Sequence, residues 1–109
     1  NVYTNSFNIV FSMEVFYYLE NPQKTINYIF NYLLKDNGCF VMGIDHYLEN
    51  TESLTWPIDL NVHMWTYSIL EWTQMFENAG FSNIKVSQFG EKKKWLGTLV
   101  IYAEKSTKN

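Results

Sequence analysis

The sequence is short of several residue types, and each shortage excludes a class of protein. Cys39 is the only cysteine among 109 residues, so the chain cannot form an internal disulfide. A lone cysteine inside an apolar run is typical of a small buried side chain in a reducing compartment, and we expect a cytoplasmic protein. No stretch approaches the roughly 18 consecutive apolar residues of a membrane-spanning helix, so no membrane partner is expected. The first residues do not form a charged and then apolar leader, so we expect no signal peptide in this sequence.

Positive charge is also scarce. The sequence has 8 Lys and Arg residues against 11 Asp and Glu residues, which gives a formal net charge of -3. The one basic cluster, Lys92-Lys93-Lys94, is typical of a solvated turn. Because nucleic-acid binding depends largely on neutralising phosphates, the charge balance argues against a nucleic-acid partner.

Hydrophobic and aromatic residues, in contrast, are plentiful. They make up 47% and 18% of the sequence, which supports a packed core and argues against disorder. The length suits one small domain or a piece of a larger one. Because the chain begins with Asn1 rather than Met, we expect a processed chain or a part cut from a longer one.

A strand, a helix and a second strand are predicted in the first half of the chain. Residues 7–12 and 39–44 are short apolar runs, which are typical of buried parallel strands. Between them, residues 22–34 carry apolar side chains at helical spacing, with Asn21 as the expected amino-terminal cap. Gly38 is expected to end this helix in a left-handed conformation.

Polar residues stand at the ends of both predicted strands. Ser12, Met13 and Glu14 end the first strand, and Asp45 and His46 follow the second. In open sheets of parallel strands, ligands bind at the carboxyl ends of the strands. The sequence therefore predicts a small-molecule site between these two segments.

The second half of the chain is expected to complete the sheet. Residues 68–78 have the apolar spacing of a helix, which Ala79-Gly80 ends. The runs 83–89 and 95–103 are separated by a short charged segment, which favours an antiparallel pair of strands. The order of the elements predicts an α/β protein whose mixed sheet is covered by helices.

Four segments, taken in order, carry a family resemblance. Residues 7–19 look like a fourth strand and the segment that leads into the next helix. Residues 33–41 look like a Leu-Lys-Pro-Gly-Gly turn into a fifth strand, and residues 71–81 look like a last helix with its Ala-Gly-Phe turn. The runs 83–89 and 95–103 look like sixth and seventh strands. In this order and spacing, the chain resembles the carboxyl-terminal half of class I S-adenosylmethionine-dependent methyltransferases.

The resemblance implies both a fold and an activity. The fold is a partial Rossmann-like sheet in which the seventh strand runs antiparallel between the fifth and the sixth. The activity is transfer of a methyl group from S-adenosylmethionine to an oxygen or nitrogen of a small-molecule acceptor. Asn8 stands where the family often has Asp, and Asp36-Asn37 stand where it often has Pro-Gly. These departures are mild, because Asp and Asn also form turns.

Two cofactor-binding features of the family have no counterpart in this sequence. The glycine-rich loop after the family's first strand needs a Gly-x-Gly spacing, which none of the five glycines provides. The acidic residue that holds the ribose after the second strand is also missing. We therefore expect residues 1–109 to be the carboxyl-terminal part of a methyltransferase domain. As an isolated chain, it is expected to be inactive and to bind the cofactor weakly or not at all.

By resemblance, Ser12, Met13 and Glu14 are expected to bind the methionine and sulfonium side of S-adenosylmethionine. A carboxylate and a polarizable sulfur suit a sulfonium cation. The alternative is an ordinary strand end, with Glu14 solvated and Met13 packed.

The resemblance also implies that Asp45, His46 and Tyr47 face the acceptor. Asp45 and His46 are the candidate catalytic residues, because either could accept a proton from an oxygen or nitrogen. Since methyl transfer depends mainly on positioning, such a base is optional. The alternative is the start of a loop with solvated polar residues.

The long connection at residues 45–64 suits a short helix at 50–54, and loops of this length are often functional. It could form a lid whose aromatic side chains wall the acceptor pocket, with His63 and Trp65 nearby. The candidate substrate-binding residues are Tyr47, Glu49, Trp56 and Met64. The alternative is that the tryptophans cover the sheet edge or the last helix.

Other readings of the sequence stay open or are disfavoured. No metal site is expected, because the His, Asp and Glu residues of the connection match no standard ligand spacing. A non-catalytic α/β module that binds a protein partner is one alternative. A nucleotide- or flavin-binding domain is another, but Ser12-Met13-Glu14 offers one hydroxyl and no glycine for a phosphate. If an upstream strand is missing, residues 7–12 expose an open edge through which the chain would self-associate.

Overall fold

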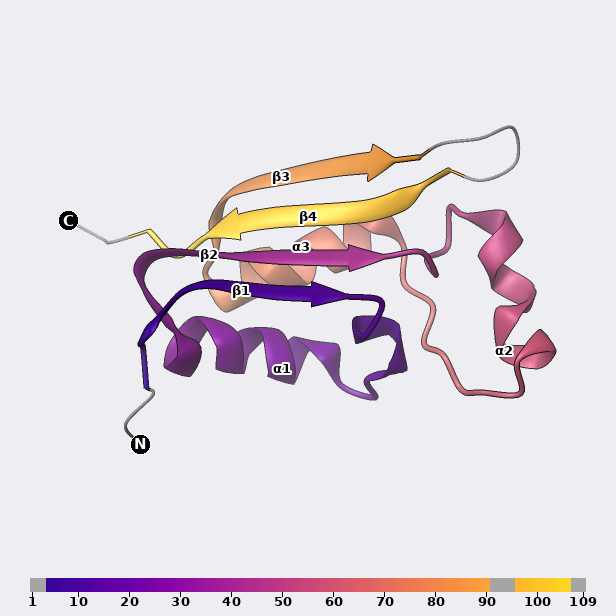
Figure 1. Ribbon diagram of the computed structural model, residues 1–109, viewed down its shortest axis with the longest axis horizontal. Helices are drawn as coiled ribbons and strands as arrows, with labels where there is room; N and C mark the ends of the chain where they lie inside the picture. Colours follow the sequence, from indigo (N-terminus) through magenta and orange to yellow (C-terminus); the bar gives the residue numbers. More distant parts are fainter. Residues whose placement is uncertain (1–3, 91–95, 107–109) are drawn as a thin grey trace.

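The computed structural model describes residues 4–90 and 96–106 of the chain. The strands are β1 (Phe7–Met13), β2 (Leu34–Ile44), β3 (Ser82–Phe89) and β4 (Thr98–Glu104). The helical segments are η1 (Phe16–Tyr18), α1 (Pro22–Tyr28), η2 (Ile29–Leu33), η3 (Thr51–Thr55), α2 (Trp56–Asp59) and α3 (Ile69–Ala79). Figure 1 shows α1 and α3 running along the sheet, with α2 beyond the carboxyl end of β2.

The four strands form one mixed sheet in the order β1-β2-β4-β3. β1 pairs with β2 in parallel, whereas β4 runs antiparallel to both β2 and β3. The last strand of the sequence therefore lies inside the sheet, between β2 and β3. This topology confirms the mixed α/β sheet and the inserted antiparallel strand.

The first crossover confirms the predicted start of its helix. The Asn21 side chain accepts a hydrogen bond from the Lys24 backbone N–H at 3.1 Å, and Pro22 opens α1. The helix continues through η2, a single π-helical turn, and ends at Leu33. Leu34 is already extended and begins β2, so the second strand starts earlier than predicted.

Gly38 does not end the helix, and this prediction is wrong. It lies buried within β2, and the left-handed residue is its neighbour Asn37, with φ of 69°. A Cβ atom at Gly38 would lie 2.9 Å from the Asn8 carbonyl oxygen, because β1 and β2 approach closely here. The approach joins segments distant in the sequence, so the local Asn-Gly pattern could not distinguish it from a helix end.

The last helix follows its sequence signals closely. The Ser68 hydroxyl accepts from the Glu71 backbone N–H, and the Glu71 carboxylate accepts from the Ser68 backbone N–H, which together form a capping box. Gly80 ends α3 in the left-handed region, with φ of 111°. The ring of Phe30 packs against Gly80 and leaves little room for a side chain there.

The remaining predicted elements also form. The short helix of the long connection corresponds to η3 and α2, and the two predicted final strands correspond to β3 and β4. The predicted turn at residues 92–94 and the first predicted residue of the last strand, Trp95, lie outside the described residues. Among the helices that the structure describes, none has the length and apolar character needed to cross a membrane.

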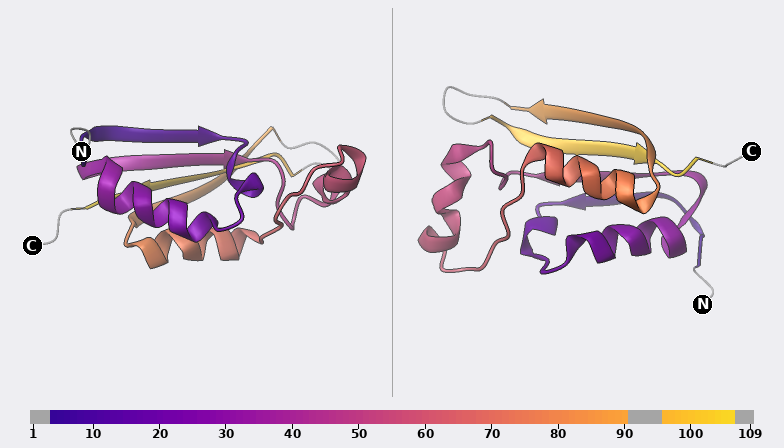
Figure 2. Two further views of the ribbon diagram at one scale, coloured as in Figure 1. Left: turned by 90° about the horizontal axis from the view of Figure 1, so that it is seen from below. Right: turned by 180° about the vertical axis from the view of Figure 1, so that it is seen from behind.

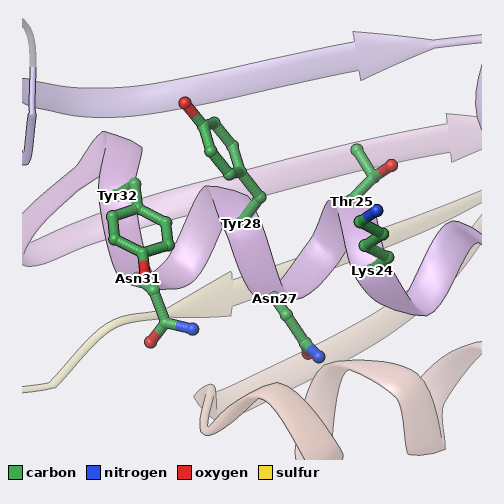
Figure 3. A pocket seen from close by; sticks show the side chains of 6 residues that line it. All are labelled: Lys24, Thr25, Asn27, Tyr28, Asn31 and Tyr32. Atoms are coloured by element: carbon green, nitrogen blue, oxygen red, sulfur yellow. The ribbon is translucent and has the colours of Figure 1, made fainter.

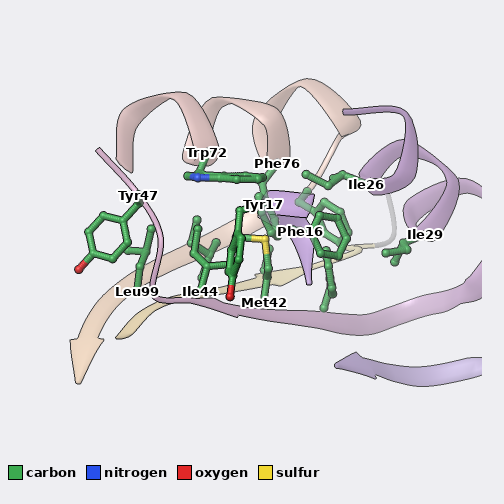
Figure 4. Packing of buried hydrophobic residues seen from close by; sticks show 14 of the residues in the cluster. Phe16, Tyr17, Ile26, Ile29, Met42, Ile44, Tyr47, Trp72, Phe76 and Leu99 are labelled. Carbon is green, nitrogen blue, oxygen red and sulfur yellow. The ribbon is translucent and has the colours of Figure 1, made fainter. Parts of the chain in front are cut away.

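The hydrophobic core lies between the sheet and the helices α1 and α3, which cover the same face (Figure 2). Trp72 and Phe76 of α3 are fully buried in this core (Figure 4). The rings of Phe76 and Phe40 stack, with their centroids 5.3 Å apart. The sheet contributes alternate, fully buried residues of its two central strands: Phe40, Met42, Ile44, Leu99, Ile101 and Ala103.

The opposite face of the sheet is open in the described part of the chain. Phe7, Ile9, Phe11 and Met13 alternate along the edge strand β1, and Ile9 and Phe11 are each 62% exposed. The prediction of a buried strand is therefore wrong for this face. Parallel strands are normally covered on both faces, but the described helices α1 and α3 cover only one (Figure 2).

Candidate functional site

The chain turns sharply where β1 ends, and this turn positions the first acidic side chain of the site. Glu14 has φ of 60°, a left-handed conformation that is uncommon for a residue other than glycine. Its backbone N–H donates to the Gly43 carbonyl oxygen at 2.8 Å, which ties the turn to β2. Strained backbone of this kind often marks functional sites.

The Glu14 carboxylate joins the ends of the two parallel strands. Its Oε1 atom accepts hydrogen bonds from the Tyr17 hydroxyl at 2.8 Å and from the Asp45 backbone N–H at 3.0 Å. Burial raises the pKa of Glu14 above its usual range. The hydrogen bonds that Glu14 accepts oppose this rise, and the nearby charge of Asp45 adds to it. Burial and the Glu14 carboxylate also raise the pKa of Tyr17, so its hydroxyl stays a donor.

Asp45 is held from two other elements. The Thr98 hydroxyl of β4 donates to Asp45 Oδ1 at 2.6 Å. The Asn50 side-chain amide donates to the Asp45 carbonyl oxygen at 2.8 Å. The ends of three strands thus position two neighbouring acidic residues at one edge of the sheet.

A cavity of about 520 Å³ opens beside these residues. It is walled by the turn after β1, the end of β2 and the long connection. Its lining combines three carboxylates, three aromatic rings and two aliphatic or thioether side chains: Glu14, Tyr17, Tyr18, Asp45, Trp56, Asp59, Leu60 and Met64. A lining of this kind can bind a cation or an amphipathic small molecule, and its carboxylates can accept a proton.

Backbone hydrogen bonds fold the long connection back over the strand ends. The Trp65 N–H donates to the Tyr17 carbonyl oxygen at 2.8 Å, and the Leu48 N–H donates to the Tyr67 carbonyl oxygen at 3.0 Å. These bonds close the connection into a loop whose residues 56, 59, 60 and 64 reach the cavity. The connection therefore forms part of the cavity wall.

His46 lies behind the cavity wall rather than in it. Its fully buried ring is 5.6 Å from the ring of Tyr17 and 6.4 Å from that of Trp56. Nδ1 donates to the Ser53 carbonyl oxygen at 2.9 Å, so Nε2 is left to accept from the Thr66 hydroxyl at 2.7 Å. Because burial lowers the pKa of His46, the ring is neutral near pH 7 and supports two of the aromatic walls.

The structure brings four of the predicted site residues together in the cavity wall. These are Glu14, Asp45, Trp56 and Met64. They come from the turn after β1, the end of β2, and the middle and the end of the connection. Trp56 thus lines the cavity, and its role in a lid over the acceptor stays a prediction.

The other predicted site residues lie elsewhere. Tyr47 is fully buried, and its hydroxyl donates to the Gly97 carbonyl oxygen at 2.8 Å. Glu49 accepts from the Ile69 backbone N–H at 3.0 Å and so supports the start of α3. Ser12 and Met13 belong to β1, where the Met13 side chain covers Gly43 on the open face.

Sequence reasoning did not single out the remaining wall residues, which are Tyr17, Tyr18, Asp59 and Leu60. Tyr17 had a usable signal, because it stands three residues after Glu14 and one helical turn brings the two side chains together. Asp59 and Leu60 follow Pro57 in a connection whose path the sequence did not predict.

A second hollow, of about 410 Å³, lies along α1 on the side of the open strand edge (Figure 3). All of its lining residues belong to α1 and η2, and the rings of Tyr28 and Tyr32 are 5.2 Å apart there. It carries one lysine and no carboxylate. With a single helix for its wall and no paired acidic groups, it is the weaker candidate for a catalytic site.

Solved structures share this fold. One is a candidate methyltransferase from Haloferax volcanii, solved in complex with the Trm112 methyltransferase activator. The TM-score is 0.82 at 23% identity, and the match covers 97% of this chain and 57% of the Haloferax chain. For a candidate histamine N-methyltransferase from Thermotoga maritima, the TM-score is 0.74 at 17% identity, with 94% and 57% covered. For Haemonchus contortus phosphoethanolamine N-methyltransferase 2, it is 0.69 at 12% identity, with 96% and 35% covered.

The chain spans only part of these proteins, at most 57% of the length in the three cases above. At these identities the likeness shows the fold alone. No curated protein matches the sequence. A family model, in contrast, matches residues 1–86, most of the chain, and describes a methyltransferase domain. The chain therefore belongs to the methyltransferase domain family.

Proposed function

We propose that the chain is the carboxyl-terminal part of a class I methyltransferase domain. As part of the longer protein, it methylates an oxygen or nitrogen of a small-molecule acceptor with S-adenosylmethionine as the donor. The observation that carries the proposal is the Glu14 carboxylate, which bridges the ends of two parallel strands beside a cavity walled by aromatic residues. In open α/β sheets, this is where ligands bind.

The residues at the end of β1 fit the cofactor. When bound, S-adenosylmethionine supplies a methyl group on a positively charged sulfur. Glu14 is half-buried, and the two donors that bond to its Oε1 atom are neutral, so its negative charge suits a cation. Ser12 and Met13 precede it on β1, and we assign all three residues to the cofactor side of the site.

The end of β2 and the long connection are assigned to the acceptor. Asp45 is held by Thr98 and Asn50, and it is the candidate proton acceptor with the better access to the cavity. That His46 acts as a base stays a prediction. Both of its ring nitrogens already have partners, so taking up a proton at Nε2 would require the Thr66 hydroxyl to change from donor to acceptor.

The other assigned acceptor residues differ in how directly they can act. Trp56 and Met64 line the cavity and can contact an acceptor. Tyr47 and Glu49 act through others: Tyr47 anchors the loop that contains Gly97, and Glu49 supports the first turn of α3. Their role in substrate binding stays a prediction.

The rest of the cofactor site is proposed to come from residues outside this chain. The sequence contains no Gly-x-Gly loop, and the open face and edge of β1 match a surface that further structure would cover. As an isolated chain, it is expected to bind the cofactor weakly and to self-associate through β1.

The names of the solved relatives support a small-molecule acceptor. The Haemonchus protein was solved with phosphomonomethylethanolamine and S-adenosylhomocysteine, and the Thermotoga protein is described as a candidate histamine N-methyltransferase. The Haloferax protein was solved with an activator protein. A partner of that kind is a further proposal for this chain.

Calorimetry of the full-length protein with S-adenosylhomocysteine tests the proposal. We expect saturable binding. We also expect Glu14→Ala to weaken binding of S-adenosylmethionine, whose sulfur is positively charged, and Glu52→Ala to leave it unchanged. Glu52 is an exposed residue of η3 outside the cavity wall. Absence of binding heat at high ligand concentration would refute the methyltransferase proposal.

The second candidate is a non-catalytic interaction module derived from the same fold. The exposed apolar side chains of β1 favour it. It predicts that the full-length protein binds neither S-adenosylhomocysteine nor S-adenosylmethionine.

A further inference from the structure

The charges in the cavity wall are all of one sign. Glu14, Asp45 and Asp59 line the cavity, and none of the described residues in its wall is a lysine, arginine or histidine. A neutral acceptor would gain hydrogen bonds from three carboxylates but no attraction between opposite charges. An acceptor whose reacting end is a phosphate or carboxylate would be repelled.

Among the described residues, neutral groups donate the hydrogen bonds to these carboxylates. Glu14 accepts from a tyrosine hydroxyl and a backbone N–H, and Asp45 accepts from the Thr98 hydroxyl. Asp59 accepts from the Thr55 hydroxyl at 2.9 Å. These bonds hold the carboxylates in place without neutralising their charge, so the cavity keeps a negative potential.

Aromatic rings wall the same space. Tyr17 and Tyr18 have ring centroids 4.6 Å apart, and Trp56 approaches from the connection. The faces of such rings attract cations, most strongly where water is partly excluded. The aromatic walls are a second observation, independent of the carboxylates, that points to a positively charged ligand.

We propose that the methyl acceptor is an amine, which the cavity binds in its protonated form between the carboxylates of Glu14, Asp45 and Asp59 and the rings of Tyr17, Tyr18 and Trp56. The inference rests on the proposed function and narrows its acceptor from oxygen or nitrogen to nitrogen. The carboxylates act as charged hydrogen-bond acceptors for the ammonium N–H groups, and the rings contact its carbon substituents.

The same carboxylates give the amine proton a place to go. An ammonium nitrogen has no lone pair until it loses one proton. Transfer of that proton to a carboxylate oxygen of Asp45, the candidate proton acceptor of the site, turns the ammonium and the carboxylate into a neutral amine and a carboxylic acid, so atoms and charge balance. The proton then leaves to solvent.

A matched pair of probes tests the inference. Benzylammonium and benzyl alcohol have nearly the same shape and differ in charge. In the full-length protein saturated with S-adenosylhomocysteine, we expect calorimetry to show benzylammonium binding at least about tenfold more tightly than the alcohol. A change in tryptophan fluorescence on titration that is lost in a Trp56→Phe variant would report that the probe enters this cavity.

Variants of the carboxylates test whether they cause the preference for benzylammonium over benzyl alcohol. Glu14→Gln keeps a hydrogen-bond acceptor for Tyr17 and for the Asp45 N–H, and Asp59→Asn changes an exposed residue. Each is expected to reduce the preference for the ammonium probe severalfold, whereas Glu52→Gln, outside the cavity, leaves it unchanged. Circular dichroism confirms folding, and Asp59→Asn carries the test if Glu14→Gln does not fold.

The outcomes separate this inference from the proposed function. Equal binding of the two probes, with S-adenosylhomocysteine binding intact, overturns the amine acceptor and leaves the methyltransferase proposal standing. If the protein binds benzylammonium but does not bind S-adenosylhomocysteine, the methyltransferase proposal is overturned and the cation-binding cavity remains. If Glu14→Gln and Asp59→Asn reduce binding of S-adenosylmethionine relative to S-adenosylhomocysteine but do not affect benzylammonium, the carboxylates serve the sulfonium and the inference is wrong.

Discussion

The two faces of the sheet differ sharply, although both are built from the same strands. One face packs against α1 and α3 and contains the fully buried residues of β2 and β4. The other face carries Ile9 and Phe11 in the open, on the edge strand β1. Alternation along a strand sends neighbouring side chains to opposite faces, so apolar residues on both sides call for cover on both sides. The chain therefore carries apolar residues on a sheet face that its described residues do not cover.

Truncating one phenylalanine on each face should give the largest contrast in stability. Phe76→Ala removes a fully buried ring that stacks on Phe40, and we expect it to lower the free energy of unfolding by about 3–5 kcal/mol. Phe11→Ala removes a ring that is mostly in solvent, and we expect a change of no more than about 0.5 kcal/mol. Urea denaturation measures both. Similar losses for the two variants would mean that the outer face is covered in solution.

Acid should distinguish a buried from an exposed histidine, with a smaller effect. Burial lowers the pKa of His46 below its ordinary value of 6.5. Its contribution to stability is therefore present above pH 6.5 and is lost as the pH falls towards the lowered pKa. We expect urea midpoints of the wild type to fall on acidification through this range and those of His46→Gln to fall less.

His63→Gln is the control for this experiment, since it removes an exposed histidine. It should keep the acid sensitivity of the wild type. Comparing the variants separates the effect of His46 from that of Glu14. Because the pKa of Glu14 is raised, its contribution to stability is present at low pH and is lost as the pH rises through the raised pKa, which is opposite to the effect of His46. Equal acid sensitivity in His46→Gln and the wild type would contradict the role given to the buried ring.

A charge on the outer face should change stability least and association most. We expect the isolated chain to form dimers or larger species, because β1 offers an apolar face and an open edge. Phe11→Lys should shift it towards monomer with little change in the urea midpoint. Gel filtration with light scattering measures the mass. A wild-type chain that stays monomeric at high concentration would argue against self-association through β1.

Predictions from sequence succeeded where short-range signals act. Asn21 caps α1 and Gly80 ends α3 as predicted, because each depends on hydrogen bonds within a few residues. Gly38 was misread, because its role is to let Asn8 of another strand approach. A local pattern carries no information on such a contact.

The candidate site shows the same limit. The sequence indicated Glu14 and Asp45 because both stand at the ends of apolar runs, and they do join at one cavity. It could not tell that His46, beside Asp45, turns away from the cavity to bond with Ser53 and Thr66. Tyr17 and Asp59 entered the wall only through the turn after β1 and the path of the connection.

Local pattern and composition were therefore enough for the type and order of the elements, the helix caps and the two strand ends that carry acidic residues. These depend on propensities and hydrogen bonds that act over a few residues. Packing of distant segments accounts for the rest: which face of β1 is open, which side chains wall the cavity, and why the charged residues described in that wall are all acidic. Burial and charge environment depend on neighbours from the whole fold, and a linear pattern does not contain them.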